Sequence, residues 1–206
     1  MYDKSVYAFA DKQLAQLRRK IIRLFGRLPG LTAFDELNVM RSVRAMYEEL
    51  YDIVRESYLL IAESAYTAER KQSMGAMRDK WLEEMLVGYN PVTQYVFDNE
   101  FERKMYRCAE SLIAATGNRK SEAERARNLL YTQVSEYAVQ VTDAARAQAF
   151  ADMHVEKTRW VTQRDRKVCH VCEARDGHIY LLSKVPSKPH PHCRCYIERV
   201  RDDKRL

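Results

Sequence analysis

Four cysteines near the C-terminal end are the residues whose type and spacing indicate chemistry. Cys169 and Cys172 form a Cys-x-x-Cys pair, and twenty residues later Cys193 and Cys195 form a Cys-x-Cys pair. In a cytosolic protein, cysteine pairs at such short spacing are more often metal ligands or redox groups than structural disulfides. The spacing therefore favours a bound metal ion, and zinc is the metal that such ligand sets hold in a tetrahedral site.

The first pair lets two thiolates converge on one metal, and the second half of the site has two candidate sources. His190 precedes Cys193 at the same spacing as the first pair, which would give three cysteines and one histidine. Cys193 with Cys195 would give four cysteines, because alternate residues of a strand face the same side. The predicted ligands of a structural zinc ion are four of the following five residues: Cys169, Cys172, Cys193, Cys195 and His190.

Other interpretations of these cysteines stay open. They could form a disulfide late or outside the cell, or they could be reduced thiols that only pack. Redox or nucleophilic chemistry is disfavoured, because Cys169-His170-Val171-Cys172 lacks the strand-to-helix setting of a thioredoxin-type motif. A catalytic metal would need an open coordination position and a general base, and nothing in the sequence places Asp165 or Glu173 at the metal. We therefore expect a protein that is not an enzyme.

The segment that carries the cysteines, residues 155–206, is predicted to be a small module. Its hydrophobic pattern alternates at Thr158–Thr162, Ile179–Leu181 and Cys193–Ile197, which predicts three strands. A unit of this size has little apolar material and needs a metal, disulfides or a host body to pack on. Trp160 is expected to fill its core.

Residues 1–154 show the helical period and are predicted to form a helical body. Between Leu37 and Ala65, for example, apolar residues recur every three or four positions and make a wide apolar face that suits a bundle. The predicted fold class is mainly α: a helical bundle with a small C-terminal Cys-rich β module. The predicted helices span residues 3–25, 33–66, 77–87, 91–115 and 121–153.

Three of these helices have start signals in the sequence. Thr32, with Asp35 three residues later, approximates a capping box for the second helix. Asn90 followed by Pro91 predicts the start of the fourth helix, because Asn caps helices and Pro suits the first helical position. Ser121 and Glu124 form a capping box for the last helix.

Composition and charge narrow the class of protein. The chain has 206 residues, of which 46% are hydrophobic and 31% charged, as in ordinary soluble globular proteins. It has no apolar run of ~18 residues, so we expect no membrane span. Its first residues lack the order of a signal peptide, so we expect a cytoplasmic origin. The net charge is +6, and residues 151–206 hold thirteen Lys and Arg against eight Asp and Glu, which permits contact with nucleic acid or an acidic protein.

The C-terminal residues together resemble the signature of a phage protein family. Trp160-x4-Asp165-x3-Cys169-x2-Cys172-x3-Asp176-Gly177, followed by Pro189-His190-Pro191-x-Cys193-Arg194-Cys195, is similar to the phage minor head proteins, the Mu F-like or head morphogenesis family. Upstream, Tyr89-Asn90-Pro91-Val92-Thr93 and Glu100-x-x-Arg103-Lys104 are similar to minor capsid proteins of the same group. The resemblance runs from about residue 85 to 200. An Arg-Thr-Glu element often found before the tryptophan is not evident, and Asp143-Ala144-Ala145-Arg146 occupies that region.

The resemblance implies a structural role in a phage particle. It implies a minor capsid protein, in multiple copies per virion, that associates with the portal protein and the major capsid protein. Such a protein assists head assembly and could take part in DNA packaging or ejection. It would be found in the host cytoplasm during assembly and in the phage head afterwards.

Two other functions are weighed against this one. A zinc-dependent DNA-binding or packaging factor would use the basic C-terminal segment, but the segment lacks interleaved aromatic residues and a recognition helix after the cysteines. A nuclease of the HNH type would also carry cysteine pairs, but the sequence has no His-Asn-His core.

Overall fold

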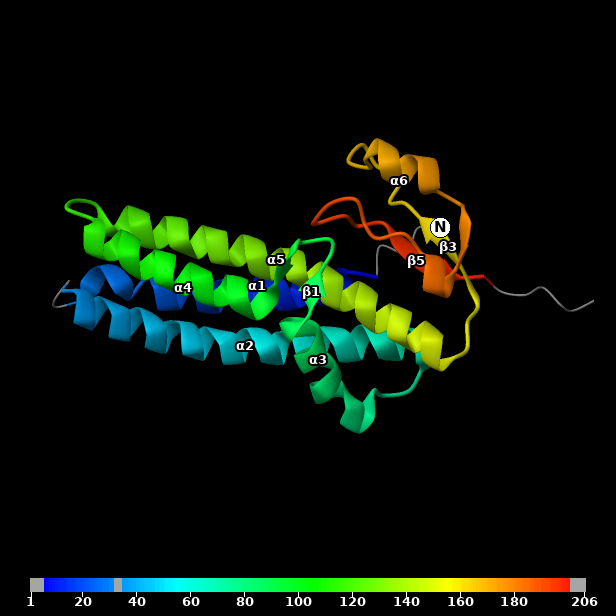
Figure 1. The fold of residues 1–206 in the computed structure, drawn as a ribbon, viewed down its shortest axis with the longest axis horizontal. Helices are drawn as coiled ribbons and strands as arrows, with labels where there is room; N and C mark the ends of the chain where they lie inside the picture. The colour runs from blue at the N-terminus through cyan, green and yellow to red at the C-terminus, as the bar shows by residue number, and fades with distance from the viewer. Residues whose placement is uncertain (1–5, 32–34, 201–206) are drawn as a thin grey trace, which may run out of the picture.

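The structure, a computed structural model, describes residues 6–31 and 35–200. Four long helices lie side by side along the longest axis, and a small sheet with a short helix lies at one end (Figure 1). The fold is therefore mainly α with a small C-terminal β module, as the sequence predicts. The elements are α1 (Ala8–Phe25), η1 (Leu28–Gly30), α2 (Glu36–Arg70), η2 (Gly75–Met77), α3 (Arg78–Val87), β1 (Tyr89–Asn90), β2 (Tyr95–Val96), α4 (Phe97–Ala114), α5 (Arg119–Asp152), β3 (Lys157–Val161), α6 (His170–Arg175), β4 (Ile179–Leu181), η3 (Leu182–Lys184) and β5 (Tyr196–Arg199).

Helix α5 is the central helix of the bundle and packs against α1, α2 and α4. Small residues on its buried faces, such as Ala138 and Ala145, let the neighbouring helices approach closely. Larger tyrosine side chains fill the space between the helices, and their hydroxyl groups donate hydrogen bonds to backbone carbonyls. Tyr58 of α2 donates to the carbonyl of Val134 at 2.8 Å, and Tyr137 of α5 donates to the carbonyl of Met85 at 2.6 Å. Each buried ring thus keeps a hydrogen bond, as burial of a phenol requires.

The predicted helix 91–115 is wrong at its start, because residues 89–96 form a β-hairpin and α4 begins only at Phe97. The Asn90 side chain accepts hydrogen bonds from the backbone N–H groups of Val92 (2.9 Å) and Thr93 (3.2 Å), which makes a turn and not a helix cap. Gln94 then adopts a positive φ of 63°, which closes the turn. Asn and Pro favour turns as strongly as helix starts, and here the turn prevails.

Of the other two predicted helix starts, one is replaced by a neighbouring cap and one lies partly outside the described residues. Asp35 caps α2 by accepting from the N–H of Asn38 at 2.9 Å, while Thr32 lies outside the described residues. Asn118 caps α5 by accepting from the N–H of Ser121 at 3.1 Å, so Ser121 itself is already in the first helical turn. Ser121 can cap a helix but does not do so here, because Asn118, which can also cap, lies one turn earlier.

The remaining helix bounds differ by a few residues. Helix α1 occupies the predicted 3–25 from Ala8 onward, and residues 3–5 lie outside the described part of the chain. Helix α2 continues to Arg70 and ends where Lys71 adopts a positive φ of 64°, four residues beyond the predicted end. Helix α3, at Arg78–Val87, begins one residue after the predicted 77–87. Within the described residues, no helix is both long enough and apolar enough to cross a lipid bilayer.

The C-terminal module contains a three-stranded antiparallel sheet in the order β4-β3-β5. In the central strand β3, Trp160 pairs with Ile197 of β5, and Thr158 pairs with Tyr180 of β4. The first two strands match the prediction closely. The third predicted strand, Cys193–Ile197, is wrong at its start: β5 begins at Tyr196, so Cys193 and Cys195 lie in the loop before it.

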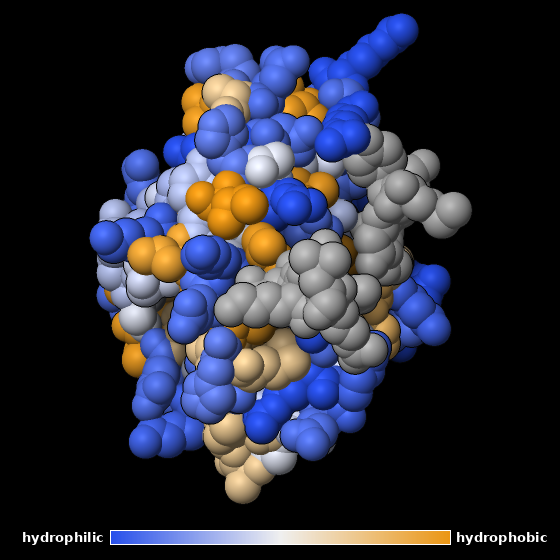
Figure 2. Space-filling model, turned by 90° about the vertical axis from the view of Figure 1, so that its right-hand side faces the viewer, coloured by the Kyte–Doolittle hydropathy of each residue, from blue (hydrophilic) through white to orange (hydrophobic). Residues whose placement is uncertain are grey.

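The body and the module have separate cores. The larger core lies among the bundle helices, and the smaller one consists of Trp160 with Cys172, Cys193 and Cys195. Trp160 therefore fills the core of the module, as predicted. Figure 2 looks onto the end of the molecule that carries the module, where hydrophilic groups surround separate hydrophobic patches.

The two candidate caps of α5 give a direct test of the helix start. We expect Asn118→Ala to lower the free energy of unfolding by about 1 kcal/mol, because it removes the side-chain acceptor of the Ser121 N–H and leaves that N–H with the carbonyl of Asn118. The matched variant Ser121→Ala should change it by less than about 0.5 kcal/mol, because no helix N–H depends on that hydroxyl. Urea unfolding followed by circular dichroism measures both, and the reverse order would show that Ser121 is the cap.

Candidate metal centre

The structure brings three of the four paired cysteines together in one buried cluster. The sulfur atoms of Cys172, Cys193 and Cys195 all lie within 4.8 Å of one another, and those of Cys172 and Cys193 are 3.4 Å apart. The exposed fractions of the three residues are 0%, 3% and 4%. These three cysteines are close enough to bind a metal ion together.

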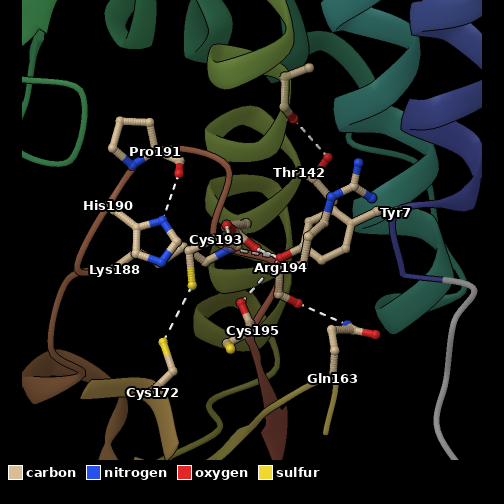
Figure 3. A network of polar contacts seen from close by, with 12 residues as sticks. Tyr7, Thr142, Gln163, Cys172, Lys188, His190, Pro191, Cys193, Arg194 and Cys195 are labelled. Atoms are coloured by element: carbon tan, nitrogen blue, oxygen red, sulfur yellow. Dashed lines mark hydrogen bonds and ion pairs between the residues drawn. The ribbon is translucent and has the colours of Figure 1, made fainter. Parts of the chain in front are cut away.

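Short backbone elements position the thiols. Helix α6 has only six residues, and its first turn closes when the N–H of Glu173 donates to the carbonyl of Cys169 at 2.9 Å. This turn presents Cys172 to the module core. On the opposite side, the amide of Gln163 donates to the carbonyl of Arg194 at 2.8 Å, which fixes the loop between Cys193 and Cys195 (Figure 3). The cluster thus joins a helix and a loop that are about twenty residues apart in sequence.

The two other predicted ligands, Cys169 and His190, border the same site. Both line a cavity of about 120 Å³, which the three clustered cysteines also line. Cys169 is partly exposed and lies within hydrogen-bonding reach of Cys172 and His190, but its sulfur is outside the group of three. All five predicted ligands therefore line one cavity. The sequence leaves open whether His190 or Cys195 completes the site, and the structure places Cys195 in the central group, with Cys169 and His190 at its edge.

The dimensions of the cluster fit a tetrahedral thiolate site. With metal–sulfur bonds of about 2.3 Å, the sulfur atoms around a zinc ion are about 3.8 Å apart. The observed 3.4 Å between Cys172 and Cys193 and the limit of 4.8 Å for the three sulfurs bracket this value. All five cysteines of the chain are free thiols in the structure. The residues present therefore fit a soft divalent metal ion.

The three clustered thiols differ in their readiness to ionise. A hydrogen bond from Cys195, together with the nearby charge of Lys188, lowers the pKa of Cys193 to about 5. Burial raises the pKa of Cys172 to about 12, and the neighbouring Cys193, followed by burial, raises that of Cys195 well above its usual range. A cation entering the site would meet one thiolate and would displace protons from the other two, so metal binding would release protons.

His190 is oriented by the backbone next to it. Its Nδ1 atom is 2.7 Å from the carbonyl oxygen of Pro191, a contact that raises the pKa of the ring (Figure 3). This leaves Nε2 as the atom that could contact the Cys169 sulfur or bind a metal, and such a backbone contact is the usual way to fix a metal-binding histidine. His192 lies 3.3 Å from Glu136 of α5.

A buried polar network ties the cysteine loop to the helical body. The ammonium group of Lys188 forms an ion pair with Asp143 of α5 and donates to the Tyr7 hydroxyl and to the carbonyl of Cys193, both at 2.7 Å. The Tyr7 hydroxyl donates to Asp143 at 2.6 Å, and the carbonyl of Cys195 is 3.3 Å from it. The residue before α1 and the middle of α5 therefore both contact the loop that carries two of the candidate ligands (Figure 3).

Arg194, between the two cysteines, strengthens this contact. Its guanidinium binds both carboxylate oxygens of Asp11 in α1, at 2.6 and 3.0 Å, and lies 5.0 Å from the centre of the Tyr7 ring. Asp165 instead accepts from the N–H of Lys167 in its own turn. The cysteine loop therefore contacts α1 through Asp11, which lies 183 residues before Arg194 in the sequence.

Sequence reasoning identifies the cysteines but misses the residues that dock them. Tyr7, Asp11, Asp143 and Lys188 carry no local motif, and their roles depend on contacts between distant parts of the chain. The sequence holds one indication of the role of Asp143. This charged residue interrupts the run Val141-Thr142-Asp143-Ala144-Ala145, whose other residues are small and mostly apolar. A carboxylate in such a setting needs a buried partner.

A further residue of the signature, Asp176, has structural contacts in the module. Asp176 accepts from the N–H of Thr162 at 2.9 Å and pairs with Arg164 at 3.0 Å, which ties the end of α6 to the segment after β3.

Cys108, which stands apart from the other cysteines, is buried in α4, and burial raises the pKa of its thiol to about 12. A thiol in this state is a small hydrophobic group and not a nucleophile.

Comparisons with known proteins do not identify the family of this chain. No protein-family model and no curated protein matches the sequence, and no solved structure matches the fold.

The buried polar network predicts that two cations of the cysteine loop, Lys188 and Arg194, contribute differently to the free energy of unfolding. Lys188 and Asp143 have side chains that are 9% and 23% exposed, so Lys188→Met should cost on the order of 3 kcal/mol of stability, because the Asp143 carboxylate would lose its countercharge and keep the Tyr7 hydroxyl as a donor. Arg194 and Asp11 are 40% and 51% exposed, so Arg194→Met should cost about 1 kcal/mol or less. Guanidinium unfolding of both variants in a Trp81→Phe background, where Trp160 fluorescence reports on the module, measures the difference. Equal costs would contradict the importance of the buried pair.

Proposed function

We propose that the cysteine cluster is a structural zinc site that holds the C-terminal module together. The observation that carries the proposal is the convergence of Cys172, Cys193 and Cys195 in a buried group of tetrahedral dimensions. Thiolate-rich sites of this kind select zinc among the common metals of the cell. The small core of the module, with Trp160 as its one large ring, gives a physical reason for such a site.

Cys169 is proposed as the fourth ligand. Its thiol is in reach of Cys172, with which it forms the Cys-x-x-Cys pair, and partial burial is outweighed by hydrogen bonds from Cys172 and His190 that lower the pKa of Cys169. His190 then serves as the neighbour that orients and stabilises this thiolate. A zinc ion in a site of four thiolates has no open position for a substrate, which supports a structural role.

We also propose that the chain is a structural minor head protein that associates with the portal and capsid of a phage. The sequence resemblance of residues 158–198 to that family carries this proposal. In support, the signature residues belong to one structural unit: Trp160 packs with the cysteines, and Asp176 closes the turn next to them. The long helical body leaves extended faces for protein partners.

The alternative of a DNA-binding factor has less support from the charges of the module. Two cations of residues 151–206 pair with carboxylates of the helical body: Arg194 with Asp11, and Lys188 with Asp143. These cations neutralise carboxylates of the same chain, so part of the basic excess of residues 151–206 is already engaged. DNA contact therefore remains a secondary proposal.

The zinc site is tested by metal analysis of the protein purified without added chelator. We expect one zinc ion per chain in the wild type and less than about a tenth of that in Cys172→Ser, which removes a central ligand. Unfolding of the wild type by a chelator should quench or shift Trp160 fluorescence in the Trp81→Phe background. Wild-type protein without bound metal would refute the zinc site.

The matched pair Cys169→Ser and His190→Ala identifies the fourth ligand. We expect Cys169→Ser to lower the affinity for zinc at least as much as removal of any other ligand, and His190→Ala to lower it ~10–100-fold, as loss of an outer-shell partner does. Competition with a chromogenic chelator measures both affinities. A larger loss in His190→Ala than in Cys169→Ser would assign the fourth position to the histidine.

The role in the phage head is tested by co-purification. We expect the chain to be present in heads purified from the phage that encodes it and to co-elute with the co-expressed portal protein in size-exclusion chromatography. Nuclease treatment of the samples is the control for association through DNA. Absence of the chain from both heads and portal complexes would refute this role.

A further inference from the structure

We propose that the cavity between the helical body and the C-terminal module binds a neutral, extended peptide segment of a partner protein, with one large apolar side chain inserted. This inference does not depend on the metal site or on the role in the phage head. It rests on the walls of the cavity, on two buried donors without acceptors, and on the apolar residues at its rim.

The cavity lies where body and module meet and has a volume of about 280 Å³. Its walls are mostly apolar. Met85 and Ala147 line it from the helical body, and Val185, Pro186 and Ile197 line it from the module. Its size is at the lower end of the range for small-molecule sites, so it suits one large side chain with its backbone better than a bulky cofactor.

Two side chains that line the cavity keep hydrogen-bond donors that the chain does not satisfy. The Nε2 atom of Gln140 and the Nε1 atom of Trp160 are buried and have no acceptor among the described residues. Gln140 and Trp160 are 6% and 2% exposed, so open solvent does not easily supply an acceptor. Buried donors of this kind are normally paired, and their presence beside a cavity points to a ligand that carries carbonyl oxygens.

The charges around the cavity favour a neutral ligand. The two charged residues that line it, Asp143 and Lys188, form an ion pair with each other. A phosphate or a carboxylate would therefore find no unpaired cation in these walls. Peptide carbonyls are strong acceptors without net charge and fit this environment.

Exposed apolar residues adjoin the lining residues of the cavity in the chain. Val87 and Tyr89, which lie in sequence between the lining residues Met85 and Asn90, are 56% and 65% exposed. Leu181, next to the lining residue Leu182, is 44% exposed. A single small molecule in the cavity would leave these residues uncovered, whereas a peptide segment that continues past the rim would cover them. This favours a protein partner over an isolated small ligand.

The probe for a first test is N-acetyl-L-phenylalaninamide, which carries an aromatic side chain and two neutral carbonyl groups. We expect it to bind at millimolar concentration and to shift the indole N–H signal of Trp160 saturably in ¹⁵N–¹H NMR spectra. The indole signal of Trp81, which does not line the cavity, is the internal reference. The absence of a saturable shift at Trp160 would overturn the proposal.

Two variants of α5 separate the cavity from the rest of the surface. Ala147→Phe places a ring in the cavity and should weaken binding of the probe at least tenfold. Ala151→Phe adds the same ring at an exposed position of the same helix outside the cavity and should leave binding unchanged. Equal affinities of the two variants would place the probe elsewhere and contradict the proposal.

The role of the unpaired donors is tested with a ligand that lacks acceptors. Ethylbenzene has the same ring but no carbonyl, and we expect it to bind at least fivefold more weakly than the amide. Gln140→Leu, which removes one donor at similar volume, should reduce this preference. If ethylbenzene binds as tightly as the amide, the ligand of the cavity is a purely apolar small molecule and not a peptide, and the inference is overturned.

Discussion

The buried ion pair between Asp143 and Lys188 is the interaction on which the arrangement of the two parts depends. It lies between the middle of α5 and the loop before the second cysteine pair, and it is completed by the Tyr7 hydroxyl and the carbonyl of Cys193. Taking a carboxylate and an ammonium out of water is costly, and the cost is recovered only when geometry and hydrogen bonds are good. A pair satisfied in this way specifies one position of the module and disfavours others.

This constraint also explains how so small a module can be ordered. The sheet of β3, β4 and β5 encloses little apolar material beyond Trp160 and the cysteines. A unit of this kind gains stability from two sources, a metal that cross-links its loops and a host surface to pack on. The loop that carries two of the candidate metal ligands, Cys193 and Cys195, is also the loop held by Tyr7, Asp11 and Asp143. Metal binding and docking on the body act on the same few residues and should stabilise each other.

The errors of sequence reasoning in the helical body have a common physical cause. Asn90 and Ser121 are residues that can cap a helix, and the same side chains can close turns or stand inside a first turn. The Asn90 side chain closes the turn of a hairpin, and Asn118 takes the cap that Ser121 could have provided. These choices depend on differences of about 1 kcal/mol between neighbouring residues, which packing of the whole helix easily overrides.

The sequence by itself determined the fold class, the existence of the long helices and the identity of the candidate ligands. Apolar periodicity over many turns and two cysteine pairs at short spacing are local signals that survive any tertiary arrangement. Only the tertiary structure decided that Cys172, Cys193 and Cys195 form the centre of the site, with Cys169 and His190 at its edge. It also decided that Tyr7 and Asp11 hold the cysteine loop, because contacts across more than 180 residues depend on how the helices pack and leave no pattern in the local sequence.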